Sequence, residues 1–133
     1  ADGQYTQNQH YPDSLLYTTT NGVKVRSKSE VIIAEHLDMY KIPFRYEAEL
    51  ILGPRKFYPD FTILNPKDNQ IVYWEHFGMI DNSQYARNAK RKLVAYAKYN
   101  IKPCDNLILT YEGESQPIDL KRINSIIKAF ITD

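Results

Sequence analysis

Two strand-like runs decide the fold of this chain: KFYPDFTIL at residues 56–64 and QIVYWEHF at residues 70–77. Both are rich in aromatic and β-branched residues, and the polar turn NPKDN separates them. A similar run, PFRYEAELI (43–51), precedes them and ends shortly before Gly53-Pro54. Because short connections favour antiparallel neighbours, we predict a three-stranded meander over residues 43–77.

Helical and strand patterns flank this meander. We predict a hairpin at 15–25, helices at 27–40, 83–99 and 117–131, and a strand at 106–112. Ser27 with Glu30, and Asp81 with Gln84, form capping boxes before the first two helices. A strand, a crossover helix and a strand imply that the last strand pairs in parallel. The predicted fold class is α/β (α+β), with a small mixed sheet flanked by helices.

The chain has 133 residues, which fits one domain. We predict a polar, loosely held N-terminal arm at 1–14 and a single domain at 15–133, with its hairpin turning through a type I′ Asn21-Gly22 turn. No apolar run is long enough to predict a membrane span. Nothing at the N-terminus resembles a signal peptide, and a start at Ala1 without methionine indicates a trimmed chain or part of a larger protein.

The single cysteine, Cys104, excludes a disulfide framework and a zinc site built from cysteines. It favours a reducing compartment, so we expect a cytoplasmic protein. Cys104 has no evident histidine partner, and the three histidines His10, His36 and His76 lack the spacing of a zinc enzyme or of a nucleophile–histidine pair.

Basic residues are segregated, although the net charge is only +1. Six of them and no acid lie between Ser83 and Cys104, and a second cluster precedes the first helix. Such a surface could bind a polyanion, whereas the simpler alternative is a solvated helix face. The candidates for contact with a nucleic-acid backbone are Arg26, Lys28, Arg87 and Lys98, each with ordinary surface as its alternative.

Two acids stand where acids are disfavoured, in the middle of strand-like runs. Asp60 follows Pro59, and Glu75 follows Ile71-Val72-Tyr73-Trp74. Because an unpaired buried charge is costly, a divalent cation between the two carboxylates would explain both. Oxygen ligands suit Mg²⁺ or Mn²⁺. The structural alternative is that Asp60 and Glu75 pair with Arg45 or Lys56.

The pair YPDF and WEHF, with Glu75 placed 15 residues after Asp60, resembles the PD-(D/E)XK nuclease superfamily. The resemblance covers roughly residues 26–112 and implies a restriction-endonuclease-like core in the order αβββαβ. It implies that Asp60, Glu75 and the main-chain carbonyl of His76 bind the metal. Glu30 matches an additional acid of many members, with its capping-box role as the alternative.

The chain departs from the family motif at the lysine, because Phe77 stands two positions after Glu75. Strand alternation places His76 on the opposite face, so His76 is expected to be a packed or hydrogen-bonded core residue. The substitute that the resemblance suggests is Lys92. KLVAY (92–96) resembles the QxxxY signature of RecB-like nucleases, and Lys92 shares a helix face with Tyr96, which we also take as a candidate for binding nucleic acid.

These residues lead us to expect a metal-dependent endonuclease that hydrolyses DNA phosphodiester bonds, with Asp60 and Glu75 on Mg²⁺ and Lys92 assisting. Two alternatives stay open. One is a catalytically inactive nuclease-fold module that binds nucleic acid or a protein partner, and the other is a structural domain. The chain could also act as a homodimer.

Overall fold

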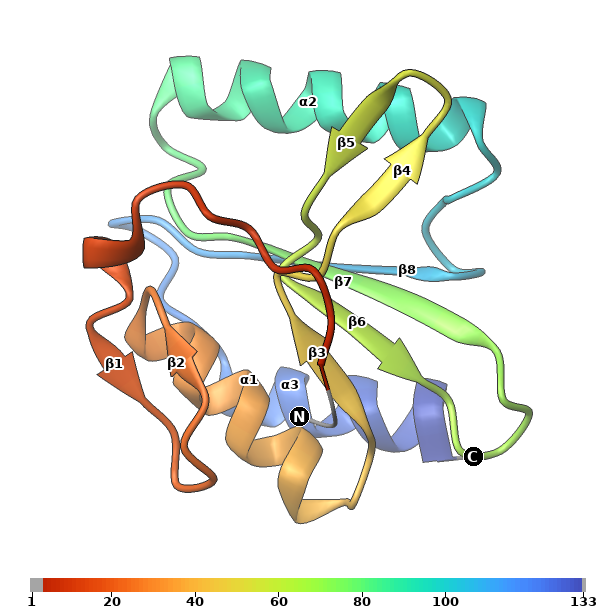
Figure 1. Ribbon diagram of the computed structural model, residues 1–133. Coiled ribbons are helices and arrows are strands. Elements are labelled where there is room, and N and C mark those ends of the chain that lie inside the picture. Colours follow the sequence, from red (N-terminus) through yellow and green to blue (C-terminus); the bar gives the residue numbers. More distant parts are fainter. Residues whose placement is uncertain (1–3, 133) are drawn as a thin grey trace.

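The computed structural model describes residues 4–132 (Figure 1), so the predictions for residues 1–3 and 133 lie outside the described part. The fold is a mixed α+β arrangement with a four-stranded sheet in the order β3-β6-β7-β8. The strands are β3 (Phe44–Tyr46), β6 (Phe61–Leu64), β7 (Ile71–Phe77) and β8 (Leu107–Tyr111). β3, β6 and β7 pair antiparallel and β8 pairs parallel to β7, which confirms the meander and the crossover.

Three helices cover the two faces of this sheet, as Figure 1 shows. They are α1 (Lys28–Met39), α2 (Ser83–Lys98) and α3 (Leu120–Ile126), and α3 continues into a π-helical turn over Ile127–Thr132. α1 and α3 lie on one face, and α2 lies on the other. None of the helices within residues 4–132 is long and apolar enough to cross a membrane.

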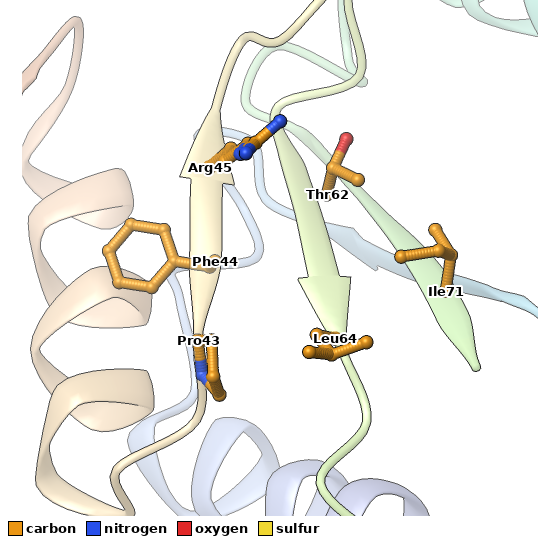
Figure 2. Close-up of a pocket in the computed structure, with 6 residues that line it drawn as sticks. All are labelled: Pro43, Phe44, Arg45, Thr62, Leu64 and Ile71. Atoms are coloured by element: carbon orange, nitrogen blue, oxygen red, sulfur yellow. The ribbon is translucent and has the colours of Figure 1, made fainter. Parts of the chain in front are cut away.

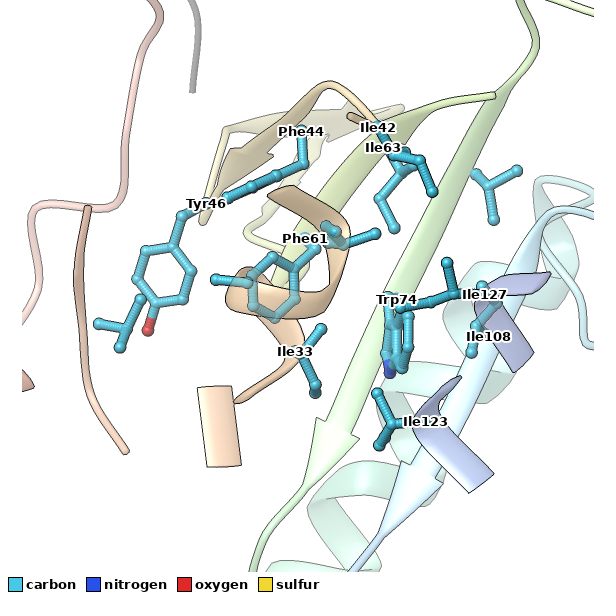
Figure 3. Packing of buried hydrophobic residues seen from close by; sticks show 14 residues of the cluster. Ile33, Ile42, Phe44, Tyr46, Phe61, Ile63, Trp74, Ile108, Ile123 and Ile127 are labelled. Atoms are coloured by element: carbon cyan, nitrogen blue, oxygen red, sulfur yellow. The ribbon is translucent and has the colours of Figure 1, made fainter. Parts of the chain in front are cut away.

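The larger hydrophobic cluster lies between the sheet and the α1–α3 layer. Figure 3 shows Trp74 of β7 beside Ile108, Ile123 and Ile127. Trp74 is fully buried, and its Nε1–H donates to Thr110 Oγ1 at 3.0 Å, so its one polar atom is satisfied. Alternate residues of each strand supply this cluster, which leaves the intervening residues facing α2.

A smaller hydrophobic cluster lies under α2. Two of the predicted strands are longer than the strands observed. The runs 43–51 and 56–64 do not stay in the main sheet, because their outer halves form a separate hairpin, β4 (Leu50–Leu52) and β5 (Arg55–Phe57). The chain leaves the sheet at Glu47, whose φ of 50° breaks the extended conformation. The hairpin then packs over α2 with Tyr96 and Leu107.

The prediction of a loosely held N-terminal arm is wrong for its described part. The Tyr5 hydroxyl bonds to both the carbonyl and the N–H of Tyr46 on the edge strand. Further along, the Asn8 N–H donates to the Glu47 carbonyl and the Glu49 N–H donates to the Thr6 carbonyl. The arm therefore lies along the Tyr46 end of edge strand β3, and covering an edge in this way hinders its pairing with another chain.

Local signals at the turns and caps were partly right. The hairpin β1 (Tyr17–Thr18) and β2 (Lys24–Val25) forms, but not with a type I′ turn. The Thr19 N–H donates to the Val23 carbonyl, which leaves the three residues 20–22 as the loop. Its Gly22 has a φ of 85°, as the residue after a type I turn requires. Asn82, not Asp81, caps α2, and its side chain accepts from the Tyr85 N–H.

Candidate active site

The two predicted strand acids meet beneath α2. Asp60 lies immediately before β6, Glu75 lies in the neighbouring β7, and Lys92 of α2 faces both across a cavity of about 160 Å³. The antiparallel β6–β7 register pairs Phe61 with Trp74, which brings Asp60 level with Glu75. The Asp60 Oδ2 accepts the His76 N–H at 2.7 Å, and this bond fixes the carboxylate at the mouth of the cavity.

Glu75 is only 1% exposed and is held by two side chains of α2. The Tyr96 hydroxyl donates to its Oε2 at 2.5 Å, and the Lys92 Nζ lies 3.3 Å from each carboxylate oxygen. Residues 92 and 96 are one helical turn apart, so both reach the sheet from the same face of α2. Lys92 therefore contacts Glu75 in the cavity that Asp60 also lines, as the resemblance led us to expect.

The cavity and its surroundings hold more negative than positive charge. Burial first, and then the charges of Glu75 and Glu30, raise the pKa of Asp60 well above its usual value. Burial acts to lower the pKa of Lys92, but the charges of Glu75 and Asp60 outweigh it and raise that pKa. Lys92 therefore stays cationic, and Asp60 ionises with difficulty unless further positive charge is supplied.

Glu30 approaches the same site from the N-terminal turn of α1. Its Oε1 accepts from the Arg26 N–H, the Ser27 hydroxyl and the Tyr46 hydroxyl, each at 3.1 Å. One oxygen of Glu30, one of Glu47 and one of Asp60 lie within 4.8 Å of one another. The capping box forms in part: Ser27 Oγ accepts the Glu30 N–H, but the Glu30 carboxylate bonds to the Arg26 N–H and the Ser27 hydroxyl, not to the Ser27 N–H. The position of Glu30 allows the role beside Asp60 as well, because the described bonds all reach Oε1.

Sequence reasoning missed Glu47, although it stands in a strand-like run just as Asp60 and Glu75 do. The signal was the same: an acid amid apolar residues in PFRYEAELI. Glu47 is buried, and Arg26 donates to both of its oxygens, through Nε at 2.7 Å and a terminal nitrogen at 3.0 Å. Its left-handed backbone turns the carboxylate from the strand direction towards the site.

Arg26 was predicted to hold a nucleic-acid backbone, and the structure turns it inward instead. Besides Glu47, its guanidinium donates to the carbonyls of His10 and Tyr11, both at 2.7 Å. Its donors are therefore engaged within the protein, where they fix Glu47 and tie the N-terminal arm beside the site. We correct its role to that of a positioning residue.

The side chain of His76 lies on the opposite face of the sheet from Glu75, as strand alternation predicted. It is buried, and its Nδ1 and Nε2 lie 2.8 Å from Thr110 Oγ1 and 2.6 Å from Glu112 Oε1. Glu112 also accepts a bond from Ser29. A strand residue has its N–H and C=O on one edge, so the His76 carbonyl points to the same side as the N–H that binds Asp60.

The other predicted nucleic-acid contacts separate into two groups. Lys28 is exposed and lines a larger cavity of about 650 Å³ that also reaches Glu30 and Asp60. Arg87 and Lys98 are exposed on α2. Tyr96 needs correction, because it is fully buried with its hydroxyl on Glu75 and cannot contact a nucleic acid. It acts on the site through Glu75.

The structural alternative requires Arg45 or Lys56 to pair with Asp60 and Glu75, but both basic side chains contact other residues. Lys56 pairs with Glu49 at 3.5 Å, and Arg45 lies over the Tyr5 ring at 5.1 Å from its centre. A third cavity, of about 260 Å³, lies on the outer part of the sheet around Arg45 (Figure 2). Proline, apolar residues, Thr62 and Arg45 line it, without a carboxylate, so it offers no comparable chemistry.

Comparison with known proteins gives one relative. The chain is 33% identical over 90 residues to the uncharacterized protein MJ1519 of Methanocaldococcus jannaschii. The matched stretch covers 68% of this chain and 8% of that protein, so the chain spans less than a tenth of the relative's length. No protein-family model matches the chain, and no solved structure matches it. The relative's name supplies no activity, so the functional argument depends on the site.

Proposed function

We propose that this chain is a metal-dependent nuclease that hydrolyses phosphodiester bonds of DNA on a restriction-endonuclease-like (PD-(D/E)XK) core. The element order supports this proposal: α1, β3, β6, β7, α2 and β8 follow the expected αβββαβ, with the β4–β5 hairpin inserted after β3. The observation that carries it is the approach of Lys92 Nζ to both oxygens of Glu75 in the cavity that Asp60 lines. A migrated lysine would restore the charge pattern that Phe77 removes from the motif.

The donor set fits a hard divalent cation. Four buried or half-buried carboxylates, those of Asp60, Glu75, Glu30 and Glu47, face two basic side chains in this region, Lys92 and Arg26. All the candidate ligand atoms are oxygens, which Mg²⁺ and Mn²⁺ prefer. Asp60, Glu75 and the His76 carbonyl would hold the ion, with Glu30 as an additional acid. When bound, such an ion lowers the pKa of water and neutralises charge on a phosphate.

The chain's own residues would orient the reactants. The Lys92 ammonium is a point charge at the carboxylate cavity, suited to holding a water molecule or a phosphate oxygen in place. Tyr96 keeps the Glu75 carboxylate in one rotamer by donating to Oε2. On the surface, Lys28, Arg87 and Lys98 would contact neighbouring phosphates without reading bases.

The decisive test is cleavage of supercoiled and single-stranded DNA with Mn²⁺, by the wild type, Asp60→Ala and Lys92→Ala. Lys90→Ala is the matched control, because Lys90 lies on the same helix but is exposed. We expect cleavage by the wild type and Lys90→Ala, and loss of cleavage in the other two. Retained metal-dependent cleavage by purified Asp60→Ala would contradict the proposal.

The same experiment discriminates the inactive binding module, for which Phe77 at the motif lysine position is the supporting observation. A wild-type protein that binds DNA but cleaves neither form with Mn²⁺ or Mg²⁺ would favour that module. A wild-type protein that neither binds DNA nor takes up either metal would leave the structural domain.

A further inference from the structure

Helix α2 presents a row of hydrogen-bond donors to the carboxylates. Tyr85, Asn88 and Lys92 are spaced by three and four residues, which places them on one face of the helix. All three line the cavity that Asp60 and Glu75 also line. The wall that the sheet forms therefore carries the carboxylates, which are negative and accept hydrogen bonds. The opposite wall, formed by α2, carries the Lys92 ammonium, the Asn88 amide and the Tyr85 hydroxyl.

Tyr85 of this row is held by a hydrogen bond and a ring contact. Its hydroxyl oxygen accepts the Gly78 N–H at 2.9 Å. Its ring packs edge-on against Phe77, with centroids 6.4 Å apart and an interplanar angle of 83°. For the hydroxyl proton, no acceptor is found among residues 4–132. The oxygen is thus fixed in place while its O–H remains available to donate.

Tyr85 lies where the carboxylate cavity meets the larger cavity that Lys28 lines. It lines the carboxylate cavity with Lys92, and it lines the larger cavity with Lys28. Asp60 and His76 also border both, so the two spaces meet at these residues. A chain of phosphates that passes from the carboxylates towards Lys28 would cross the Tyr85 hydroxyl.

We infer that Tyr85 donates a hydrogen bond to a non-bridging oxygen of a substrate phosphate where the two cavities meet. This inference rests on the proposed function for the identity of the ligand, a phosphodiester. A phosphodiester is complementary to both walls of the cavity. Its negative charge attracts the cation bound by the carboxylates, and its oxygens accept hydrogen bonds from Tyr85, Asn88 and Lys92 of α2. Tyr85 is then a substrate-contacting residue of the site, in addition to Lys92.

The test measures binding and cleavage by Tyr85→Phe. Binding of a short DNA oligonucleotide, single-stranded and duplex, is measured with Ca²⁺, which also takes oxygen ligands but at longer distances than Mg²⁺. Cleavage is measured with Mn²⁺. Tyr111→Phe is the matched control, because Tyr111 also packs on Phe77, at 5.7 Å, but lines neither of the two cavities. Thermal unfolding verifies that both variants fold.

We expect Tyr85→Phe to bind about tenfold more weakly, as loss of one hydrogen bond to a charged oxygen implies. Because Tyr85 is neutral and releases no counterion, the salt dependence of binding should stay unchanged. A set of oligonucleotides, each with one methylphosphonate, then locates the contact. At the contacted phosphate the difference between wild type and Tyr85→Phe should disappear, which a purely structural role would not produce.

Two results would overturn the inference: equal affinity and cleavage for Tyr85→Phe and wild type, or a Tyr85→Phe defect that persists with every methylphosphonate. Absence of DNA binding by the wild type would overturn both this inference and the proposed function. A wild type that binds without cleaving, with the expected methylphosphonate pattern, would support the Tyr85 contact and reject the nuclease activity alone.

Discussion

Replacing Asp60 with asparagine should stabilise the metal-free protein while it abolishes activity. The carboxylate of Asp60 is half-buried among like charges, which raises its pKa through burial and through Glu75 and Glu30. Asparagine keeps an oxygen that can accept the His76 N–H but carries no charge. A carboxyl whose pKa is raised on folding destabilises the native state when it ionises, by about 1.4 kcal/mol for each tenfold change in its proton affinity, and asparagine removes this cost. Because Lys92 loses one favourable charged partner in Asp60→Asn, we expect a net increase of about 1–2 kcal/mol in the free energy of unfolding.

The stabilisation should depend on pH in a defined direction. Because the pKa of Asp60 is raised on folding, the native protein binds more protons than the unfolded chain between the ordinary value, about 4, and the raised one. The contribution of Asp60 to wild-type stability therefore falls as pH rises through that window. The advantage of Asp60→Asn is greatest above the raised pKa and vanishes below the ordinary one.

Urea unfolding in EDTA at mildly alkaline pH and at acidic pH measures this difference. Mn²⁺ adds a second reading, since an ion that binds only the native wild type stabilises it by about 2.7 kcal/mol at one hundred times its Kd. Mn²⁺ should therefore cancel or reverse the advantage of Asp60→Asn. Asp105→Asn, an exposed aspartate, is the control and should change stability by less than about 0.5 kcal/mol. A metal-free Asp60→Asn protein less stable than wild type at alkaline pH would refute the reasoning.

Three further substitutions test the packing that supports the site. Tyr96→Phe removes the donor to buried Glu75 and should lower the free energy of unfolding by about 1–3 kcal/mol, measured with urea, and reduce cleavage. Arg26→Ala leaves Glu47 without its main partner and should cost about 3–5 kcal/mol, with faster amide exchange in residues 6–8. Gly22→Ala meets no atom but must adopt a φ of 85°, so thermal unfolding should show a loss of about 1–2 kcal/mol.

Each of these three variants has a matched control, in which a residue of the same type is replaced at another position. Tyr99→Phe, Arg87→Ala and Gly78→Ala concern exposed or spatially open positions and should each change stability by less than about 0.5–1 kcal/mol. Equal losses in a test variant and its control would contradict the role given to that contact. Unchanged amide exchange near Asn8 in Arg26→Ala would show that the arm does not depend on Arg26.

Local patterns in the sequence were sufficient for much of the fold. Ser27 caps α1 as its capping box indicates, because a cap is satisfied within four residues. Strand alternation placed Glu75 and His76 on opposite faces, and helix periodicity placed Lys92 with Tyr96. These predictions hold since the periods of strands and helices fix side-chain direction before any tertiary contact forms.

The failures concern contacts between residues far apart in the sequence. The outer halves of the predicted strands 43–51 and 56–64 leave the sheet where Glu47 takes a left-handed conformation, and Arg26, 21 residues away in the sequence, binds the Glu47 carboxylate. The N-terminal arm docks through Tyr5, which bonds an edge strand 41 residues away. Neither event has a periodic signal, so the sequence indicated a loosely held arm and an arginine on the surface.

The sequence by itself determined which residues could carry chemistry: the acids Asp60, Glu75 and Glu30, and the lysine of α2. For Asp60 and Glu75 the residue type and the place in a strand-like run were enough, because an acid amid apolar strand residues requires a partner wherever the strand lies. Glu30 and the lysine of α2 were indicated by the resemblance to the nuclease superfamily. Only the tertiary structure decided that Lys92 reaches Glu75, that Glu47 joins the acids, and that Arg26 and Tyr96 turn inward. The physical reason is that the burial and pairing of a charge depend on elements that meet only when α1, α2 and the sheet pack together.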